Sequence, residues 1–232
     1  ALEKVNGDYI AFLDCDDVWY ATKLEKQLPI FIDNEVGLVI CDTIFFNNNR
    51  DIKQLYKKTK PPTGDVFPTL LADYFISLET VMIKRDVLKT LDHWFDERFQ
   101  MIEEYDFFVR VGFKWKIAFV DEILAKWRVH ENSWTWKKPE LFPLETKLFL
   151  EKLKTSIPDF GKNYEIEIKL VENKIALQEA MVLWQKKCRN AALKKLNPYV
   201  FANKKTFLIY LWIITLPFWT FNRLNKYRVG LT

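Results

Sequence analysis

The sequence predicts an α/β sheet flanked by helices, followed by an α-helical C-terminal extension. In residues 1–136, short apolar runs of strand length alternate with helical patterns, which is typical of α/β proteins. After residue 136 the composition changes, and residues 164–196 contain neither Gly nor Pro while charged and apolar residues alternate. We therefore expect a sheet-containing domain over residues 1–136 and a helical region over residues 137–232.

The first strand is expected at residues 9–13, an apolar run followed directly by Asp14, Asp16 and Asp17. In open α/β sheets the ends of the strands face a ligand crevice. Three neighbouring carboxylates repel one another unless a cation lies among them, and oxygen ligands suit Mg²⁺ or Mn²⁺, which also bind phosphate oxygens. The segment thus predicts a metal-nucleotide site. The alternative is that Asp16 and Asp17 only end the strand through Asx-turn hydrogen bonds.

The remaining elements of the first domain follow in order. Thr22 and Glu25 have the spacing of a capping box, so a helix is expected to begin there, and Pro29 should end or kink it near residue 28. Further strands are expected at 36–41 (ending at Asp42), 80–83 and 115–120, a surface excursion at 47–64, and a helix at 103–111.

Two features are expected in the C-terminal region. Residues 164–196 predict one amphipathic helix of unusual length. Residues 207–221 form an apolar run that is shorter than the ~20 residues of a membrane-spanning helix. Because basic residues flank this run and Trp212 and Trp219 lie within it, residues 206–221 are expected to associate with a membrane surface. The alternative is an ordinary buried helix.

Composition limits the class of protein. A chain of 232 residues with 49% hydrophobic residues can bury one core plus an appendage. A net charge of +4 gives no bulk indication of nucleic acid binding, so no nucleic acid partner is expected. Three widely spaced cysteines suit a reducing compartment, and two histidines argue against a zinc site of His and Cys ligands. The start at Ala1, almost directly on a strand, suggests a fragment that lacks an N-terminal portion.

The chain resembles the family 2 glycosyltransferases of the A-type fold over residues 1 to about 135. Residues 6–19 are similar to that family's strand and its DxD metal motif. The similarity continues in order through the following helix at 23–27, the acceptor-side segment at Gly64 and 80–85, the ED signature at 103–106 with Arg110, and the Arg-x-His segment at 128–133.

This resemblance implies a Rossmann-like A-type glycosyltransferase sheet and a metal-dependent enzyme. Such an enzyme would move a sugar from a nucleotide-diphosphate sugar to a hydroxyl of a glycan or lipid-linked saccharide, with Mg²⁺ or Mn²⁺ as cofactor and inversion at the sugar. A cytoplasmic location, peripheral on the inner face of the cell membrane, is expected.

The resemblance also implies the roles of the donor-side residues. Asp14 would contact the ribose side of the nucleotide, and Asp16 would bind the metal and the nucleotide sugar. Asp17 would assist at the metal or cap the following turn. Arg128 and His130 would meet diphosphate oxygens, with His130 as a further metal ligand.

The general base is expected to be Glu104, with Glu103 as the alternate. This chain has Glu103-Glu104 where the family usually has Glu-Asp, and two acids in a first helical turn are also explained by the helix dipole. The family's N-terminal strand is absent as well, so this chain alone is expected to be inactive. Two rival hypotheses remain: a catalytically silent membrane-associated scaffold or sugar-binding relative, and, ranked last for want of a Gly-rich phosphate loop, a nucleotidyltransferase.

Overall fold

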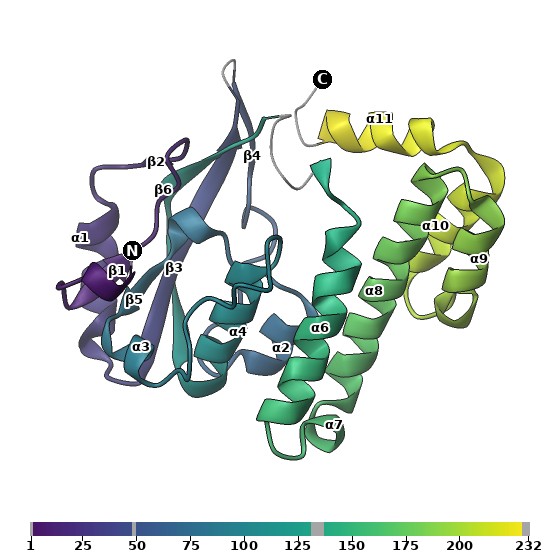
Figure 1. Cartoon of the computed structure of the whole chain (residues 1–232). Helices are drawn as coiled ribbons and strands as arrows, with labels where there is room; N and C mark the ends of the chain where they lie inside the picture. Colours follow the sequence, from purple (N-terminus) through teal and green to yellow (C-terminus); the bar gives the residue numbers. More distant parts are fainter. Residues whose placement is uncertain (1, 48–49, 131–136, 229–232) are drawn as a thin grey trace. The chain divides into compact units, whose positions relative to one another are not determined.

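The computed structural model describes residues 2–47, 50–130 and 137–228, and it divides into two compact units (Figure 1). Unit 1 comprises Ala1–Glu97 and Glu103–His130, and unit 2 comprises Arg98–Ile102 and Glu131–Thr232. The described part of unit 1 contains the whole sheet, and the described part of unit 2 contains helices without strands.

Unit 1 is built on a mixed sheet in the strand order β1-β5-β3-β6-β2, with β4 paired to β3. The strands are β1 (Tyr9–Ala11), β2 (Val18–Trp19), β3 (Val36–Phe46), β4 (Asp51–Gln54), β5 (Met82–Lys84) and β6 (Lys116–Arg128). Strands β3 and β6 run parallel, and the other pairings are antiparallel. The long pair β3 and β6 therefore forms the centre against which the shorter strands are aligned.

Helices cover this sheet on both sides. They are α1 (Lys23–Gln27), which continues as a 3-10 turn at Leu28–Ile32, then α2 (Phe67–Ala72), α3 (Asp86–Lys89) and α4 (Glu103–Lys114). Figure 1 shows α1 on one side of β3 and the packed pair α2 and α4 on the other. The expected α/β sheet with flanking helices and a helical C-terminal extension is confirmed.

Helix α1 is fixed to the sheet by a buried polar network. The Gln27 amide nitrogen donates to the carbonyl oxygens of Val39 (3.1 Å) and Thr80 (2.8 Å), and its oxygen accepts from Lys23 Nζ at 2.6 Å. Lys23 Nζ also lies 4.5 Å from the centre of the Trp19 ring. Because both polar ends of Gln27 are satisfied, a polar side chain can be buried here without leaving an unpaired donor.

Two local expectations at the start of unit 1 are only partly met. The strand β1 exists, but it is half-buried: Ile10 is buried, whereas Tyr9 keeps 38% of its surface exposed. Helix α1 begins after Thr22 as expected, but the Thr22 side chain makes no capping hydrogen bond, so the capping box is wrong. Packing of Lys23 and Gln27 against the sheet holds α1 in its place.

The strand expected at 36–41 continues to Phe46, because Asp42 does not end it. Asp42 is fully buried, and its carboxylate accepts hydrogen bonds from Gln54 Nε2 (2.6 Å) and from the backbone N–H of Tyr56 (3.1 Å). Both donors belong to the segment expected to be a surface excursion, part of which forms β4. A buried carboxylate is tolerated in a strand when its hydrogen bonds are made within the sheet.

Unit 2 is a group of helices around α8. Its elements are α6 (Leu141–Ser156), α7 (Phe160–Asn163), α8 (Glu165–Gln185), α9 (Arg189–Leu196), a 3-10 turn (Asn197–Tyr199), α10 (Lys204–Thr215) and α11 (Phe218–Arg228). Helix α8 contacts α6, α7 and α9, and α9 contacts α10. One apolar core of this unit consists of Ala176, Ala180, Trp184, Ala192, Leu196, Ile209 and Ile213, contributed by α8, α9 and α10.

The single long helix expected at 164–196 is wrong, because the chain turns between α8 and α9. Lys187 has a left-handed backbone with φ of 62°. Its N–H donates to the Trp184 carbonyl at 2.9 Å, and the Cys188 N–H donates to the Leu183 carbonyl at 2.9 Å. These two bonds form a Schellman motif, which usually has Gly at the left-handed position. Because this position is occupied by Lys187 and not by Gly, the sequence did not indicate that the helix ends here.

The apolar run at 207–221 forms two helices rather than one. Asn203 accepts a hydrogen bond from the Thr206 N–H at 2.9 Å and so caps α10, and Pro217 separates α10 from α11. Among the described helices of both units, none is long and apolar enough to cross a membrane.

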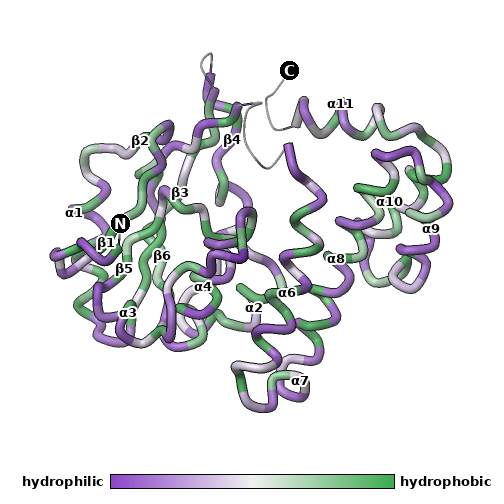
Figure 2. Tube along the Cα trace, in the orientation of Figure 1, coloured by the Kyte–Doolittle hydropathy of each residue, from purple (hydrophilic) through white to green (hydrophobic). Residues whose placement is uncertain are grey.

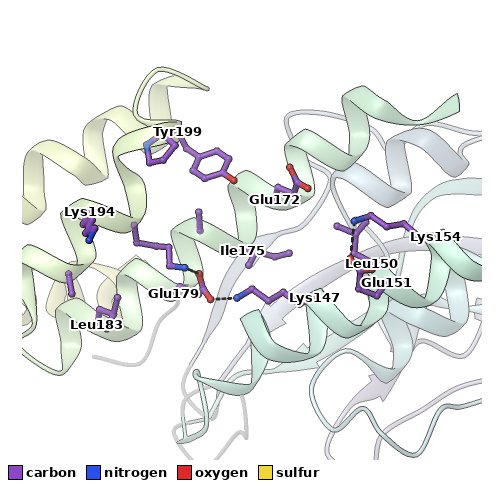
Figure 3. A pocket seen from close by; sticks show the side chains of 14 residues that line it. Lys147, Leu150, Glu151, Lys154, Glu172, Ile175, Glu179, Leu183, Lys194 and Tyr199 are labelled. Atoms are coloured by element: carbon purple, nitrogen blue, oxygen red, sulfur yellow. Dashed lines mark hydrogen bonds and ion pairs between the residues drawn. The ribbon is translucent and has the colours of Figure 1, made fainter. Parts of the chain in front are cut away.

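A charged groove of about 700 Å³ lies on unit 2 beside α6, α8 and α9 (Figure 3). At its centre Glu179 of α8 accepts a hydrogen bond from Lys195 Nζ of α9 at 2.7 Å and forms a second ion pair with Lys147 of α6. The two lysines and Glu179 thus connect three helices. We interpret this groove as structural, because its central charges form ion pairs with one another.

Replacing Lys187 with Gly is expected to stabilise unit 2 by about 0.5–1 kcal/mol, because Gly adopts a left-handed backbone without the steric cost of a Cβ. Urea unfolding measures this change. Gln185→Gly, in the exposed last turn of α8, is the matched control and should cost about 1 kcal/mol. If Lys187→Gly destabilised the protein, this result would contradict a left-handed backbone at position 187.

Candidate active site

Pairing of β2 with β6 brings the Asp cluster beside the Arg-x-His segment. Val18 of β2 pairs with Lys126 of β6, so the residues that precede β2 lie next to those that end β6. Asp17 Oδ1 accepts from the backbone N–H of Arg128 at 2.7 Å, and Arg128 Nε donates to the Asp16 carbonyl at 2.8 Å. Two segments more than a hundred residues apart in sequence therefore form one site.

Asp16 and His130 form a pair of metal-ligand groups. Asp16 Oδ2 lies 3.0 Å from His130 Nε2, and the two side chains are 39% and 41% exposed. A carboxylate oxygen and an imidazole nitrogen at this separation can be ligands of one ion that solvent can reach. These residues therefore fit the divalent cation expected from the sequence.

Carboxylates crowd together behind this pair. Burial raises the pKa of Asp17 to about 7; the hydrogen bond from the Arg128 backbone lowers it, and the charges of Glu79, Asp16 and Asp14 raise it further. The pKa of Asp14 is also raised, by burial and by the charge of Asp16. Such a group of acids is stable only when it is protonated or when positive charge is supplied.

Glu104 joins the same group from the first turn of α4. Burial raises the pKa of Glu104 to about 8, with further contributions from the charges of Glu103, Asp14 and Glu79. The nearby Tyr74 hydroxyl acts in the opposite direction. Because the charge of Asp14 acts on Glu104, we place Glu104, and not Glu103, in the same group of carboxylates as Asp14, Asp16 and Asp17.

Aromatic packing holds α4 against the end of β1. The ring of Phe12, two residues before Asp14, meets the rings of Phe107 and Phe108 edge to face, with centroids 6.3 and 5.9 Å apart. Both α4 rings are fully buried. This contact fixes Asp14 and Glu104 at the same side of the unit.

Glu79 was missed by the sequence analysis. It is buried in a 3-10 turn, Leu78–Thr80, that contacts β3 and β6. Both of its carboxylate oxygens lie 2.7–2.9 Å from the Ser77 hydroxyl, and its backbone carbonyl accepts from Trp19 Nε1 at 2.8 Å. Burial raises its pKa, although the Ser77 hydrogen bond lowers it. The available signal was an acid placed directly before the buried run at 80–83, where an unpaired charge would be costly.

A second group of possible metal ligands in the described residues fits an ion poorly. His93, Asp96 and Asp106 have ligand atoms within 4.8 Å of one another. However, Arg110 donates to Asp106 Oδ2 through Nε (3.0 Å) and Nη2 (2.7 Å), and it also donates to the carbonyl of His93. A guanidinium already neutralises this carboxylate, so the group is structural and a dication there would be repelled.

The structure therefore brings together the six residues assigned to the donor and the base: Asp14, Asp16, Asp17, Glu104, Arg128 and His130. Glu103 precedes Glu104 at the start of α4. Residues 131–133 of the segment expected to close over the diphosphate lie outside the described residues.

Comparison with known proteins decides the family. Residues 1–92 match the family model described as "Glycosyl transferase family 2". These residues therefore carry the sequence features of the family 2 glycosyltransferases. The expected fold is confirmed, because the described chain also superposes on S. aureus TarS 1-349, crystallised in complex with UDP-GlcNAc. That superposition has a TM-score of 0.56 and 16% sequence identity, and it covers 99% of this chain and 70% of TarS 1-349.

Two curated relatives of this glycosyltransferase domain are similar to part of the chain. An uncharacterized glycosyltransferase of Methanocaldococcus jannaschii is 28% identical over 56% of this chain and 44% of its own length. The Escherichia coli UDP-Glc:alpha-D-GlcNAc-diphosphoundecaprenol beta-1,3-glucosyltransferase WfgD is 33% identical over 38% of this chain and 33% of its own length. The chain thus spans less than half the length of either relative.

In the absence of divalent cations, unit 1 is expected to lose stability as pH rises from about 5 to 8. The pKa of Glu104 is raised to about 8 on folding, so the folded state holds a proton that the unfolded state has released above about pH 4.5. Glu104→Gln should flatten this fall by roughly 2–4 kcal/mol, since one pKa unit corresponds to about 1.4 kcal/mol.

Urea unfolding in EDTA at several pH values measures the effect. Glu25→Gln, a change on the surface of α1, is the control and should leave the pH profile unchanged. If the stability of Glu104→Gln and of the unsubstituted protein fell equally with pH, this result would contradict a raised pKa of Glu104.

Proposed function

We propose that this glycosyltransferase moves a sugar from a nucleotide-diphosphate sugar to a hydroxyl of a glycan or lipid-linked saccharide, with inversion at the anomeric carbon. The observation that carries the proposal is the grouping of Glu104 with Asp14, next to the Asp16–His130 pair. A general base and a place for a charged leaving group are the two requirements of this reaction.

Glu104 is the proposed general base. The acceptor oxygen forms a bond to the anomeric carbon, its proton passes to the Glu104 carboxylate, and the bond from the anomeric carbon to the diphosphate oxygen breaks. A pKa of about 8 makes Glu104 a stronger base than an exposed glutamate. Its environment thus suits proton abstraction from a hydroxyl.

The donor is proposed to bind on the side of Asp14, Asp16, Arg128 and His130. Asp16, Asp17 and His130 are the ligands we assign to Mg²⁺ or Mn²⁺, which when bound neutralises charge on the departing diphosphate. Arg128 would meet the same diphosphate, from a position fixed by its hydrogen bond to the Asp16 carbonyl.

We assign sugar transfer to residues 1–136 and propose that the helical region over 137–232 places the enzyme near its acceptor. The relative WfgD is named for a lipid-linked diphosphate acceptor, which supports an acceptor of that class here. Nucleotide-sugar chemistry at such an acceptor is consistent with a cytoplasmic enzyme, peripheral on the inner face of the cell membrane.

Release of nucleoside diphosphate from a panel of sugar nucleotides, by the intact protein with Mn²⁺, tests the proposal. Glu104→Gln should lower turnover by about 10²–10⁴-fold through loss of the base while nucleotide binding remains. Asp16→Ala should lower turnover at least as far and should also weaken Mn²⁺-dependent nucleotide binding.

The control is Asp86→Asn, which removes an exposed acid paired with Lys89 on α3 and should leave turnover unchanged. Retained turnover in Glu104→Gln would move the base elsewhere, with Glu103 the first candidate. No release with any sugar nucleotide would favour the silent scaffold.

A further inference from the structure

Charge is distributed very unevenly along this chain. Of its 35 basic and 31 acidic residues, ten basic residues and no acidic residue lie in 180–232, which leaves 25 basic against 31 acidic residues before position 180. The end of unit 2 is therefore strongly positive although the whole chain carries only +4. A surface of this kind attracts an anionic partner.

Helix α10 within this positive region is apolar on two opposite faces. Thr206, Ile209 and Ile213 are buried toward the core of unit 2. The opposite face consists of Phe207, Leu208, Leu211 and Ile214, each of which is 38–45% exposed. Figure 2 shows how hydrophobic residues dominate α10. The buried face explains the folding of α10, and the exposed face requires another partner.

Helix α11 adds further exposed apolar side chains. Trp219 is 64% exposed and Leu224 is 54% exposed. A hollow of about 550 Å³ beside α10 and α11 is lined by Lys204, Lys205, Leu208, Ile209, Trp212, Phe221 and Leu224. We call the exposed side chains of α10 and α11, together with Lys204 and Lys205, the α10–α11 face.

We propose that the α10–α11 face docks in the plane of an anionic phospholipid bilayer. Lys204 and Lys205, in the first turn of α10, would meet lipid phosphates, while the exposed aliphatic face and Trp219 enter the boundary between headgroups and acyl chains. The hollow beside the lysines offers space for one acyl chain. This inference deepens the proposed peripheral location and rests on it.

A bilayer fits this surface better than a nucleic acid or a second protein copy. The exposed face of α10 contains three aliphatic residues besides Phe207, whereas single-stranded nucleic acids require aromatic rings for stacking. Lys147 and Lys195 of the charged groove are paired with Glu179, whereas among the described residues neither Lys204 nor Lys205 forms an ion pair. Exposed apolar area and uncompensated positive charge occur on the same face.

Co-sedimentation of the 232-residue chain with vesicles tests the proposal. We expect binding to vesicles with 30% phosphatidylglycerol, at least ten-fold weaker binding to pure phosphatidylcholine, and loss of most binding at 0.5 M salt. Lys204→Glu with Lys205→Glu should weaken binding at least ten-fold. Leu208→Ser with Leu211→Ser should weaken it at least five-fold, because the apolar contact is lost.

Matched controls separate this face from general charge and hydrophobicity. Lys57→Glu with Lys58→Glu changes two adjacent exposed lysines of unit 1, and Ile166→Ser with Leu170→Ser changes two exposed apolar residues of α8. Both controls should bind vesicles as the unsubstituted chain does. Circular dichroism and thermal unfolding verify that each variant is folded.

Equal binding by the α10–α11 variants and the controls would overturn the proposal. Tighter binding to polyuridylate than to vesicles, unchanged in Leu208→Ser with Leu211→Ser, would overturn it in favour of a nucleic acid. Failure is separable from failure of the proposed reaction: nucleoside diphosphate release in solution does not require vesicles, so the intact protein can lose either property alone.

Discussion

Mutual repulsion among buried carboxylates is the constraint on which the structure of unit 1 depends. Burial raises the pKa of Asp14, Asp17, Glu79 and Glu104, and the charges of neighbouring carboxylates raise each of them further. A sheet that gathers four acids loses stability unless protons or a cation compensate their charge. The Asp16–His130 pair lies at the edge of this group, so a divalent ion bound there would relieve the repulsion and retain the diphosphate of a donor.

The fold produces this arrangement through few contacts. Antiparallel pairing of β2 with β6 places Asp17 against the Arg128 backbone, and the packing of Phe12 on α4 places Glu104 opposite Asp14. The core contacts are thus also the contacts that position the chemistry. Unit 2 contributes a different property, since its strongly basic end and the exposed face of α10 form the surface that we propose for attachment to a bilayer.

Sequence predicted what depends on local pattern or on resemblance to a family. The strand before Asp14, the helix at Glu104 and the sheet with flanking helices follow from apolar periodicity, and the pairing of Asp16 with His130 agrees with the roles that the family assigns. Features that depend on long-range contacts were missed. These are the burial of Asp42 within β3, the strand β4, and the buried Glu79, each of which is stabilised by residues that are distant in sequence. The turn at Lys187 was also missed, because tertiary packing overrides the preference of lysine for a helical backbone.

Binding of Mn²⁺ to the protein tests the central claim most directly. Titration followed by electron paramagnetic resonance, in the presence of a nucleoside diphosphate, should show one bound ion that Asp16→Asn or His130→Ala weakens at least ten-fold. His93→Ala, in the group neutralised by Arg110, should leave the affinity unchanged. Binding that survives in Asp16→Asn and is lost in His93→Ala would place the ion elsewhere and contradict the account.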